Sequence, residues 1–282
     1  MIISKNKTIK TLTAVFLIFT LIFGLSGCSV ARKIKNKIDP PEPITERPSV
    51  RLTFPEGSSV AEIAKILETG NVCTAEEFLA TAQNASLLTE FGFEIANPEN
   101  RSFVLEGYLF PDTYDFYIGE GAEAAAKRFL KNSQKKLGSD IRAKCAELGF
   151  TLDEILALAS IIQEEAGDPA DMGMVSSVLH NRLASDAFPK LQCDAVTFYL
   201  RDSVEPYVTP ERYEYLSGLY GTYLRDGLPE GPITNSGIDA VNAALNPEES
   251  DYYYFITDSE NVYHYAETYK EHLVNCENAG LT

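Results

Sequence analysis

Residues 151–167 read TLDEILALASIIQEEAG, and the rest of the predicted architecture is organised around this stretch. Thr151, followed three residues later by Glu154, forms a capping box, which starts a helix. Apolar residues then repeat at helical spacing until Gly167, a residue that commonly follows the end of a helix. The pattern therefore predicts one strongly apolar helix over residues 152–166.

Two neighbouring carboxylates near the end of this helix fall in different environments. On a helical wheel, Ile155, Ala159 and Ile162 mark the centre of the apolar face. Glu165 falls on the flank of that face, whereas Glu164 points toward water. A carboxyl group beside apolar neighbours is desolvated, which raises its pKa and keeps a proton available near neutrality. Glu165 is thus a candidate general acid, able to protonate a glycosidic oxygen; the alternative is an inert acid near a helix end.

Helix and strand signals surround this helix without regular alternation. Residues 50–54 alternate like a half-buried strand, and capping boxes at Ser59 and Thr74 start two short helices. The segment 191–237 is rich in Pro and Gly and is predicted to be mostly loop. The remaining predictions are helices near 122–137, 174–183, 238–245 and 268–275 and a strand near 252–257. Such a mixture indicates an α+β fold.

The N-terminus has the pattern of an export signal. Lysines precede an apolar run over residues 12–25, which closes on Leu25-Ser26-Gly27-Cys28. This closing segment resembles the lipoprotein box, in which the cysteine, here Cys28, is lipidated and becomes the first residue. The prediction is a signal peptide over 1–27 and a Pro-containing tether over 28–49. The alternative is an uncleaved signal anchor; both place the remainder outside the cytoplasm, tethered to the cell membrane.

Charge and cysteine content exclude several classes of function. The formal net charge of −17 argues against nucleic-acid binding, which needs clustered Lys and Arg. The spacing of the cysteines after residue 28 is long, and no Cys/His cluster accompanies them, so no metal site is predicted. Two disulfides are open to an exported protein, but buried thiols are expected because a chain of this length does not depend on cross-links. These cysteines are Cys73, Cys145, Cys193 and Cys276.

Residues 158–167, LASIIQEEAG, resemble the catalytic segment of the YceG-like family of endolytic murein transglycosylases. Further segments agree with that family in the same order, over residues 50–275. Each segment alone is a weak signal, whereas the ordered set is highly specific. The additional segments are LEGYLFPDTY (105–114), NRL (181–183), LQCD (191–194), YGTY (220–223), GLPEGPI (227–233) and the tail residues His264, Thr268, Tyr269, Glu271 and His272.

In the family motif the catalytic glutamate is the last acid of a Glu-x-Glu-like pair, which falls on Glu165. Gln163 stands at the first acid of the pair, so that position cannot tune Glu165 or substitute for it. Other departures lie beside the motif residues and bear on loop shape and substrate fit more than on the reaction. They are Cys193, Ala195, Glu230 and Ser236.

The resemblance implies a reaction that consumes no water. Glu165 protonates the oxygen between a MurNAc and the next GlcNAc, and an oxocarbenium-like centre develops. The carboxylate then takes the proton of the C6 hydroxyl of the same sugar, which closes a 1,6-anhydro ring. No cofactor and no second carboxylate nucleophile are required, and Glu106, Asp112 and Asp194 are candidates for stabilising the cation; each is also a common cap or turn residue.

Polar and aromatic residues of the shared segments are predicted to bind the sugar strand. Arg182 offers donors to acetamido, lactyl or peptide carboxylate groups, although it can equally form an ion pair on a helix surface. His264 and His272 are expected to be structural or to orient substrate. Tyrosines concentrate late in the chain, where sugar rings can stack on them. The predicted substrate-binding set is Asn181, Arg182, Gln192, Asp194, Thr222, Tyr223 and Glu106.

The expected organisation is a small LysM-like module over 50–105, followed by a YceG-like catalytic domain over 106–282. The resemblance implies peptidoglycan as substrate, internal cleavage of its strands during cell-wall assembly and elongation, and association with peptidoglycan synthases. Two other classes stay open. A hydrolytic muramidase would use the same acid to activate water, and a non-catalytic peptidoglycan-binding lipoprotein would use Glu165 for no chemistry.

Overall fold

The structure, a computed structural model, describes residues 47–281. The predicted signal peptide, the lipidation site Cys28 and nearly all of the tether lie outside the described residues. By their contacts, residues 48–282 form one compact unit. Helices and two small antiparallel sheets are mixed in it, which confirms the α+β class.

The first sheet joins two segments that are far apart in the sequence. β1 (Ser49–Thr53) pairs antiparallel with β2 (Thr113–Tyr117). Three short helices lie between the strands, and capping boxes at the predicted positions open the first two. These helices are α2 (Val60–Thr69), α3 (Ala75–Thr81) and α4 (Ala85–Glu90), and a 3₁₀ turn, η1 (Pro98–Asn100), follows them.

An aromatic cluster packs this sheet against the next helix, α5 (Ala122–Lys136). The Phe129 ring of α5 meets the rings of Phe54 at 4.8 Å and Tyr114 at 4.6 Å between centroids. Burial of such rings supplies much of the apolar contact that holds the N-terminal segment in place. α6 (Ser139–Leu148) then leads to the central helix.

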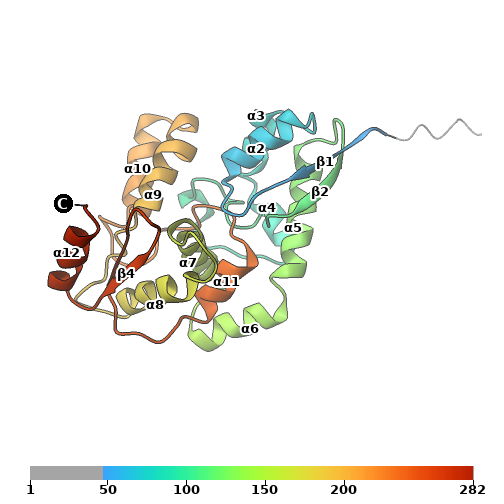
Figure 1. The fold of residues 1–282 in the computed structure, drawn as a ribbon. Helices are drawn as coiled ribbons and strands as arrows, with labels where there is room; N and C mark the ends of the chain where they lie inside the picture. Colours follow the sequence, from blue (N-terminus) through green and yellow to red (C-terminus); the bar gives the residue numbers. More distant parts are fainter. Residues whose placement is uncertain (1–46, 282) are drawn as a thin grey trace, which may run out of the picture. The chain divides into compact units, whose positions relative to one another are not determined.

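α7 (Leu152–Glu165) lies at the centre of the unit, as Figure 1 shows. Thr151 and Glu154 form the predicted capping box, and every residue from 155 to 162 is buried. α8 (Met172–Leu183) and α11 (Ile238–Leu245) pack against α7. The middle of the helix is therefore surrounded by protein, and its C-terminal end, with Glu164 and Glu165, reaches the cavities described below.

The prediction of a mostly loop segment over 191–237 is wrong in its first half. The chain there forms α9 (Asp194–Tyr199), a π-helical turn η2 (Leu200–Val204), a 3₁₀ turn η3 (Glu205–Tyr207) and α10 (Pro210–Tyr220). Pro210 stands in the first turn of α10, where its missing N–H costs no hydrogen bond, and the Thr209 side chain caps the helix.

Residues 254–278 lie beside α8 in the C-terminal part of the structure and are here called the roof. β3 (Tyr254–Thr257) and β4 (Tyr263–Ala266) make an antiparallel hairpin, and α12 (Tyr269–Asn278) packs on both strands. β3 also contacts α8. This hairpin therefore covers the region where α7 ends.

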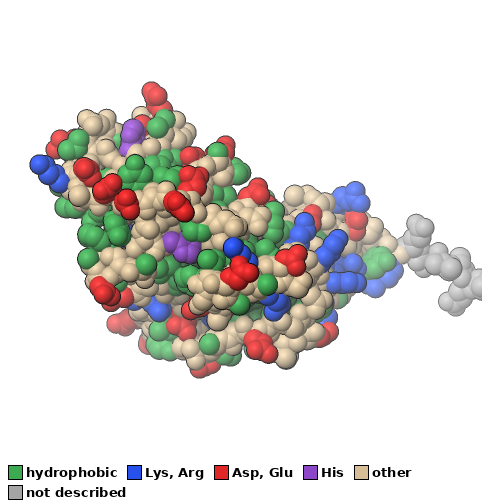
Figure 2. All heavy atoms as spheres, turned by 90° about the horizontal axis from the view of Figure 1, so that it is seen from below, with side chains coloured by type: hydrophobic (Ala, Val, Ile, Leu, Met, Phe, Trp, Pro, Cys, Tyr) green, Lys and Arg blue, Asp and Glu red, His purple; other side chains and the backbone are tan. Residues whose placement is uncertain are grey.

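Charged side chains are distributed unevenly over the surface. Figure 2 shows acidic side chains scattered over one face, with Lys and Arg gathered toward the right of the view. Cys73, Cys145, Cys193 and Cys276 are free thiols. Among residues 47–281, we find no helix with the length and apolar character that a membrane span requires, and no cluster of His, Cys, Asp and Glu that could hold a metal ion.

Candidate active site

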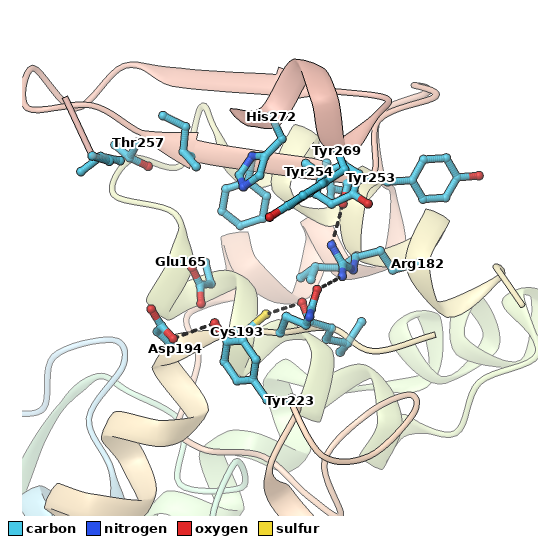
Figure 3. A pocket seen from close by; sticks show the side chains of 17 residues that line it. Glu165, Arg182, Cys193, Asp194, Tyr223, Tyr253, Tyr254, Thr257, Tyr269 and His272 are labelled. Atoms are coloured by element: carbon cyan, nitrogen blue, oxygen red, sulfur yellow. Dashed lines mark hydrogen bonds between the residues drawn. The ribbon is translucent and has the colours of Figure 1, made fainter. Parts of the chain in front are cut away.

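Glu165 lines two cavities that meet at the end of α7. The first, here called the hairpin cavity, has a volume of about 480 Å³ and is walled by β3, α12, α8 and the segment 191–194. The second, here called the acidic cavity, has a volume of about 290 Å³ and is walled by the start of α2 and by α9. Asp194 also borders both. Figure 3 shows Glu165 and Asp194 close to one another at one end of the hairpin cavity.

The carboxyl group of Glu165 is held in a form suited to an acid. Its Oε1 is buried and has no hydrogen-bond partner among the described residues. Desolvation raises its pKa above the ordinary value, and the negative charge of Asp194 raises it further. The nearby backbone N–H of Ala195 and the Cys193 thiol oppose this rise. The raised pKa predicted from the helical wheel is confirmed, with desolvation as its first cause.

Glu164 is exposed, as predicted, but the environment of its carboxyl group differs less from that of Glu165 than predicted. The residue as a whole is exposed, but its carboxylate lies close to the Gly57 turn and lines the acidic cavity. Desolvation raises its pKa to about 7, and the charges of Glu62 and Glu165 add to the rise. The Thr234 hydroxyl is close enough to lower this pKa, although it lies outside hydrogen-bonding geometry. Two neighbouring carboxyl groups with raised pKa values therefore face one cavity.

Segment 191–194 forms one wall of the site, and hydrogen bonds to Thr222 hold its backbone from the interior side. Gln192 has φ of 56°, in the left-handed region that non-glycine residues adopt only when the surroundings hold them there. The Thr222 hydroxyl accepts a hydrogen bond from Cys193 N–H at 3.0 Å, and the Gln192 N–H donates to the Thr222 carbonyl at 3.2 Å. Thr222 is buried and lines neither cavity, so it supports this wall from the interior.

Arg182 connects this wall to the roof. Its guanidinium donates to the Lys190 and Tyr253 carbonyls, both at 2.8 Å, and to Gln192 Oε1. It also lies over the Tyr254 ring, 5.4 Å from the centroid. Although Arg182 borders the hairpin cavity, these donors are directed to protein groups. Figure 3 shows this bracing on the side of the cavity away from Glu165.

The other predicted site residues divide into two groups. Gln192, Asp194 and Tyr223 line the hairpin cavity, and the Tyr223 hydroxyl donates to Asp194 Oδ1 at 2.8 Å. Asn181 lines neither cavity; its amide donates to the Ser250 and Tyr252 carbonyls and holds the approach to β3.

Glu106 and Asp112 lie away from the cavities. Glu106 is 1 % exposed and accepts hydrogen bonds from Val60 N–H, Asn235 Nδ2 and the Tyr199 hydroxyl. These partners occupy it in the interior, so the structure contradicts its predicted contact with substrate. Asp112 accepts from Thr113 N–H and Asn132, as a turn residue does, and it lies outside both cavities beside Glu165.

Several cavity-lining residues are absent from the predicted substrate-binding set, although Tyr269 and His272 belong to the tail that resembles the family. Tyr254 and His272 stack with ring centroids 5.2 Å apart in the roof, and Tyr269 lies next to them. The concentration of tyrosines in the C-terminal part of the sequence is the signal that points to these aromatic residues. In the acidic cavity, Phe198 is half exposed, and Thr234 has a buried hydroxyl that has no hydrogen-bond partner within residues 47–281. His264 lines neither cavity; its Nε2 forms a hydrogen bond with Asp258 Oδ2 at 2.7 Å within the hairpin.

The pH dependence of the reaction provides a test of this electrostatic arrangement. An acid must hold its proton, so activity is expected to fall as pH rises through the raised pKa of Glu165. Asp194→Asn removes a negative charge that raises this pKa, and the alkaline limb of kcat/KM against pH should therefore move to lower pH. Asp115→Asn is the matched control, because Asp115 is exposed, paired with Arg51 and outside both cavities. An alkaline limb that stays in place or moves upward in Asp194→Asn would contradict the assignment.

Comparison with known proteins identifies relatives of this chain. The pattern of the YceG-like family matches residues 19–278. A protein of Bacillus subtilis named endolytic murein transglycosylase is 29% identical over 232 residues, covering 79% of this chain and 63% of that protein. A protein of the same name from Streptococcus pneumoniae is 26% identical over 255 residues, covering 83% of this chain and 44% of that protein.

A solved structure extends the comparison to the fold. The crystal structure of a yceG-like protein from Listeria monocytogenes superimposes with a TM-score of 0.70 at 29% identity, covering 80% of this chain and 75% of that one. The chain spans less than two thirds of the length of the two curated relatives. On the extent of the family match and the agreement in fold, this chain belongs to the YceG-like family.

Proposed function

We propose that this protein is a peptidoglycan lytic transglycosylase that cleaves MurNAc–GlcNAc bonds within glycan strands. The observation that carries the proposal is the position of Glu165: its buried, unpartnered carboxyl oxygen stands where two cavities meet. A strand can then occupy both cavities, with the bond to be cleaved beside the acid. The name shared by the curated relatives, endolytic murein transglycosylase, supports this substrate and this mode of cleavage.

The proposed reaction uses one residue twice. Glu165 donates its proton to the glycosidic oxygen, the bond from that oxygen to C1 of MurNAc breaks, and GlcNAc leaves with a free hydroxyl. The C6 hydroxyl oxygen of the same MurNAc then bonds to C1, and its proton passes to the Glu165 carboxylate. The acid is regenerated and no water is consumed. Asp194, which lines both cavities together with Glu165, would stabilise the positive charge at C1.

Substrate contacts in this proposal come from residues that line the cavities. Gln192 and Tyr223 would bond sugar hydroxyls in the hairpin cavity, where the rings of Tyr254 and His272 offer a stacking surface. Thr234 would donate or accept in the acidic cavity, because its hydroxyl is without a partner among the described residues. Arg182, Asn181 and Thr222 would act indirectly, by holding the walls.

We also propose where the protein is located and which proteins lie near it. The Leu-Ser-Gly-Cys28 segment supports a lipoprotein anchored to the outside of the cell membrane, and nascent strands at that surface would bring the enzyme close to peptidoglycan synthases. A LysM-like module would begin at residue 50. We extend its end from 105 to 117, because β2 supplies the strand that pairs with β1.

Product chemistry tests the function directly. The purified chain is incubated with uncrosslinked glycan strands, and the fragments are analysed by mass spectrometry. Fragments with 1,6-anhydro-MurNAc ends, each lighter by one water than the corresponding reducing-end fragment, are expected. Reducing ends would assign a hydrolytic muramidase instead. Retained strand binding without cleavage would assign a non-catalytic binding protein.

A further inference from the structure

One tyrosine hydroxyl holds the end of the catalytic helix. The last carbonyl groups of a helix have no partner within it and must be satisfied from elsewhere. The Tyr263 hydroxyl donates to the carbonyl of Glu165 at 2.6 Å, and the same oxygen accepts from the N–H of Gly167 at 2.9 Å. This hydroxyl thus binds two peptide groups, one on each side of the buried Ala166.

Tyr263 belongs to the roof rather than to the helix. It begins β4, and its ring packs 6.2 Å from the ring of Phe255 in β3 and 6.1 Å from that of Tyr265. β3 lines the hairpin cavity through each of its residues. The two hydrogen bonds of Tyr263 therefore connect the roof of that cavity to the residue that carries the acid.

The two hydrogen bonds of Tyr263 fix the backbone at the end of α7, where Glu165 stands. Helix ends fray, and Glu165 is the last residue of α7. Among the described residues Oε1 has no hydrogen-bond partner, so no contact at that oxygen would hold the side chain in place if the backbone that carries it moved. A displacement of about 1 Å in a reacting group can lower a rate by about a hundredfold.

We propose that Tyr263 is a positioning residue for the reaction: its hydroxyl holds the end of α7 against the roof and thereby aims Glu165 at the bond between the two cavities. The inference rests on the proposed function, in which Glu165 is the acid. It assigns a role in turnover to a residue that lines neither cavity.

The kinetic test compares two substitutions in the same strand, made in the full chain. Tyr263→Phe removes the hydroxyl and keeps the ring. Tyr265→Phe is the matched control, because its hydroxyl is buried and makes no hydrogen bond in the described structure. Tyr263→Phe should lower kcat about tenfold or more while KM stays within about twofold, and Tyr265→Phe should change neither beyond about twofold. An unchanged kcat in Tyr263→Phe, or a change confined to KM, would overturn the inference.

A second measurement does not need turnover. Hydrogen exchange at the Gly167 amide, followed by NMR, should be at least about tenfold faster in Tyr263→Phe than in wild type, because this amide loses its acceptor. Exchange in Tyr265→Phe should match wild type. If wild type cleaves no glycan, the proposed function fails, and the exchange data still decide whether Tyr263 holds the helix end. Equal exchange in Tyr263→Phe and wild type would show that it does not.

Discussion

Glu165→Gln is expected to lower the turnover of glycan strands by about 10²- to 10⁴-fold, the contribution that general acid catalysis makes. Glutamine has nearly the same shape but no proton to donate to the glycosidic oxygen and no carboxylate to take the C6 proton. The fold should remain intact, because in the described part of the chain Oε1 makes no hydrogen bond that the substitution would break. Release of anhydro-ended fragments over time measures the effect, and circular dichroism checks the fold.

The neighbouring residue supplies the matched control. Glu164→Gln makes the same chemical change one position earlier, at a carboxyl whose pKa of about 7 would also let it hold a proton. Glu164 lines only the acidic cavity, whereas Glu165 lines both. We expect Glu164→Gln to lose less than about tenfold in turnover, far below the general-acid contribution. If Glu164→Gln removes activity and Glu165→Gln does not, the roles of the two residues are exchanged.

The environment of Glu165 could be predicted from the sequence because it is local. Ile155, Ala159 and Ile162 repeat at helical spacing, and all three are buried in α7 as the repeat predicts. The position of Glu165 on the flank of that face follows from the same geometry. The capping box at Thr151 is equally local, since it involves residues three apart. The start of this helix, its buried face and the raised pKa of Glu165 could thus be predicted together.

The roles of Glu106 and Tyr263 could not be predicted in this way. Glu106 is satisfied by Asn235, 129 residues away, and by Tyr199, 93 residues away. Tyr263 bonds the carbonyl of Glu165 across 98 residues. Neither contact leaves a periodic pattern, so a motif can place Glu106 in a shared segment without showing whether it faces the cavity. The prediction of a loop at α10 is wrong for another reason. Proline is typical of loops, but it also favours the first turn of a helix, where Pro210 stands.

Arg101→Ala is expected to lower the free energy of unfolding by about 3–5 kcal/mol, the usual effect of removing one partner of a buried ion pair. Arg101 is 4 % exposed and donates to Asp153 in the first turn of α7. Burial raises the pKa of Asp153, and the charge of Arg101 opposes this rise. Without Arg101, the carboxylate keeps only its bond from the Tyr108 hydroxyl, at 2.9 Å. Denaturant unfolding followed by circular dichroism measures the loss.

A double substitution separates the lost charge pair from lost packing. Arg101→Met together with Asp153→Leu removes both charges and fills most of the same volume, and such replacements are often neutral. We expect the double variant to recover most of the stability that Arg101→Ala loses, because no buried carboxylate is left without a partner. A double variant as unstable as Arg101→Ala would show that Arg101 acts through other contacts, such as its close fit against Gly231. Recovery would instead show that the pair adds little net stability and that Arg101→Ala is unstable because it leaves the Asp153 carboxylate buried without its cation.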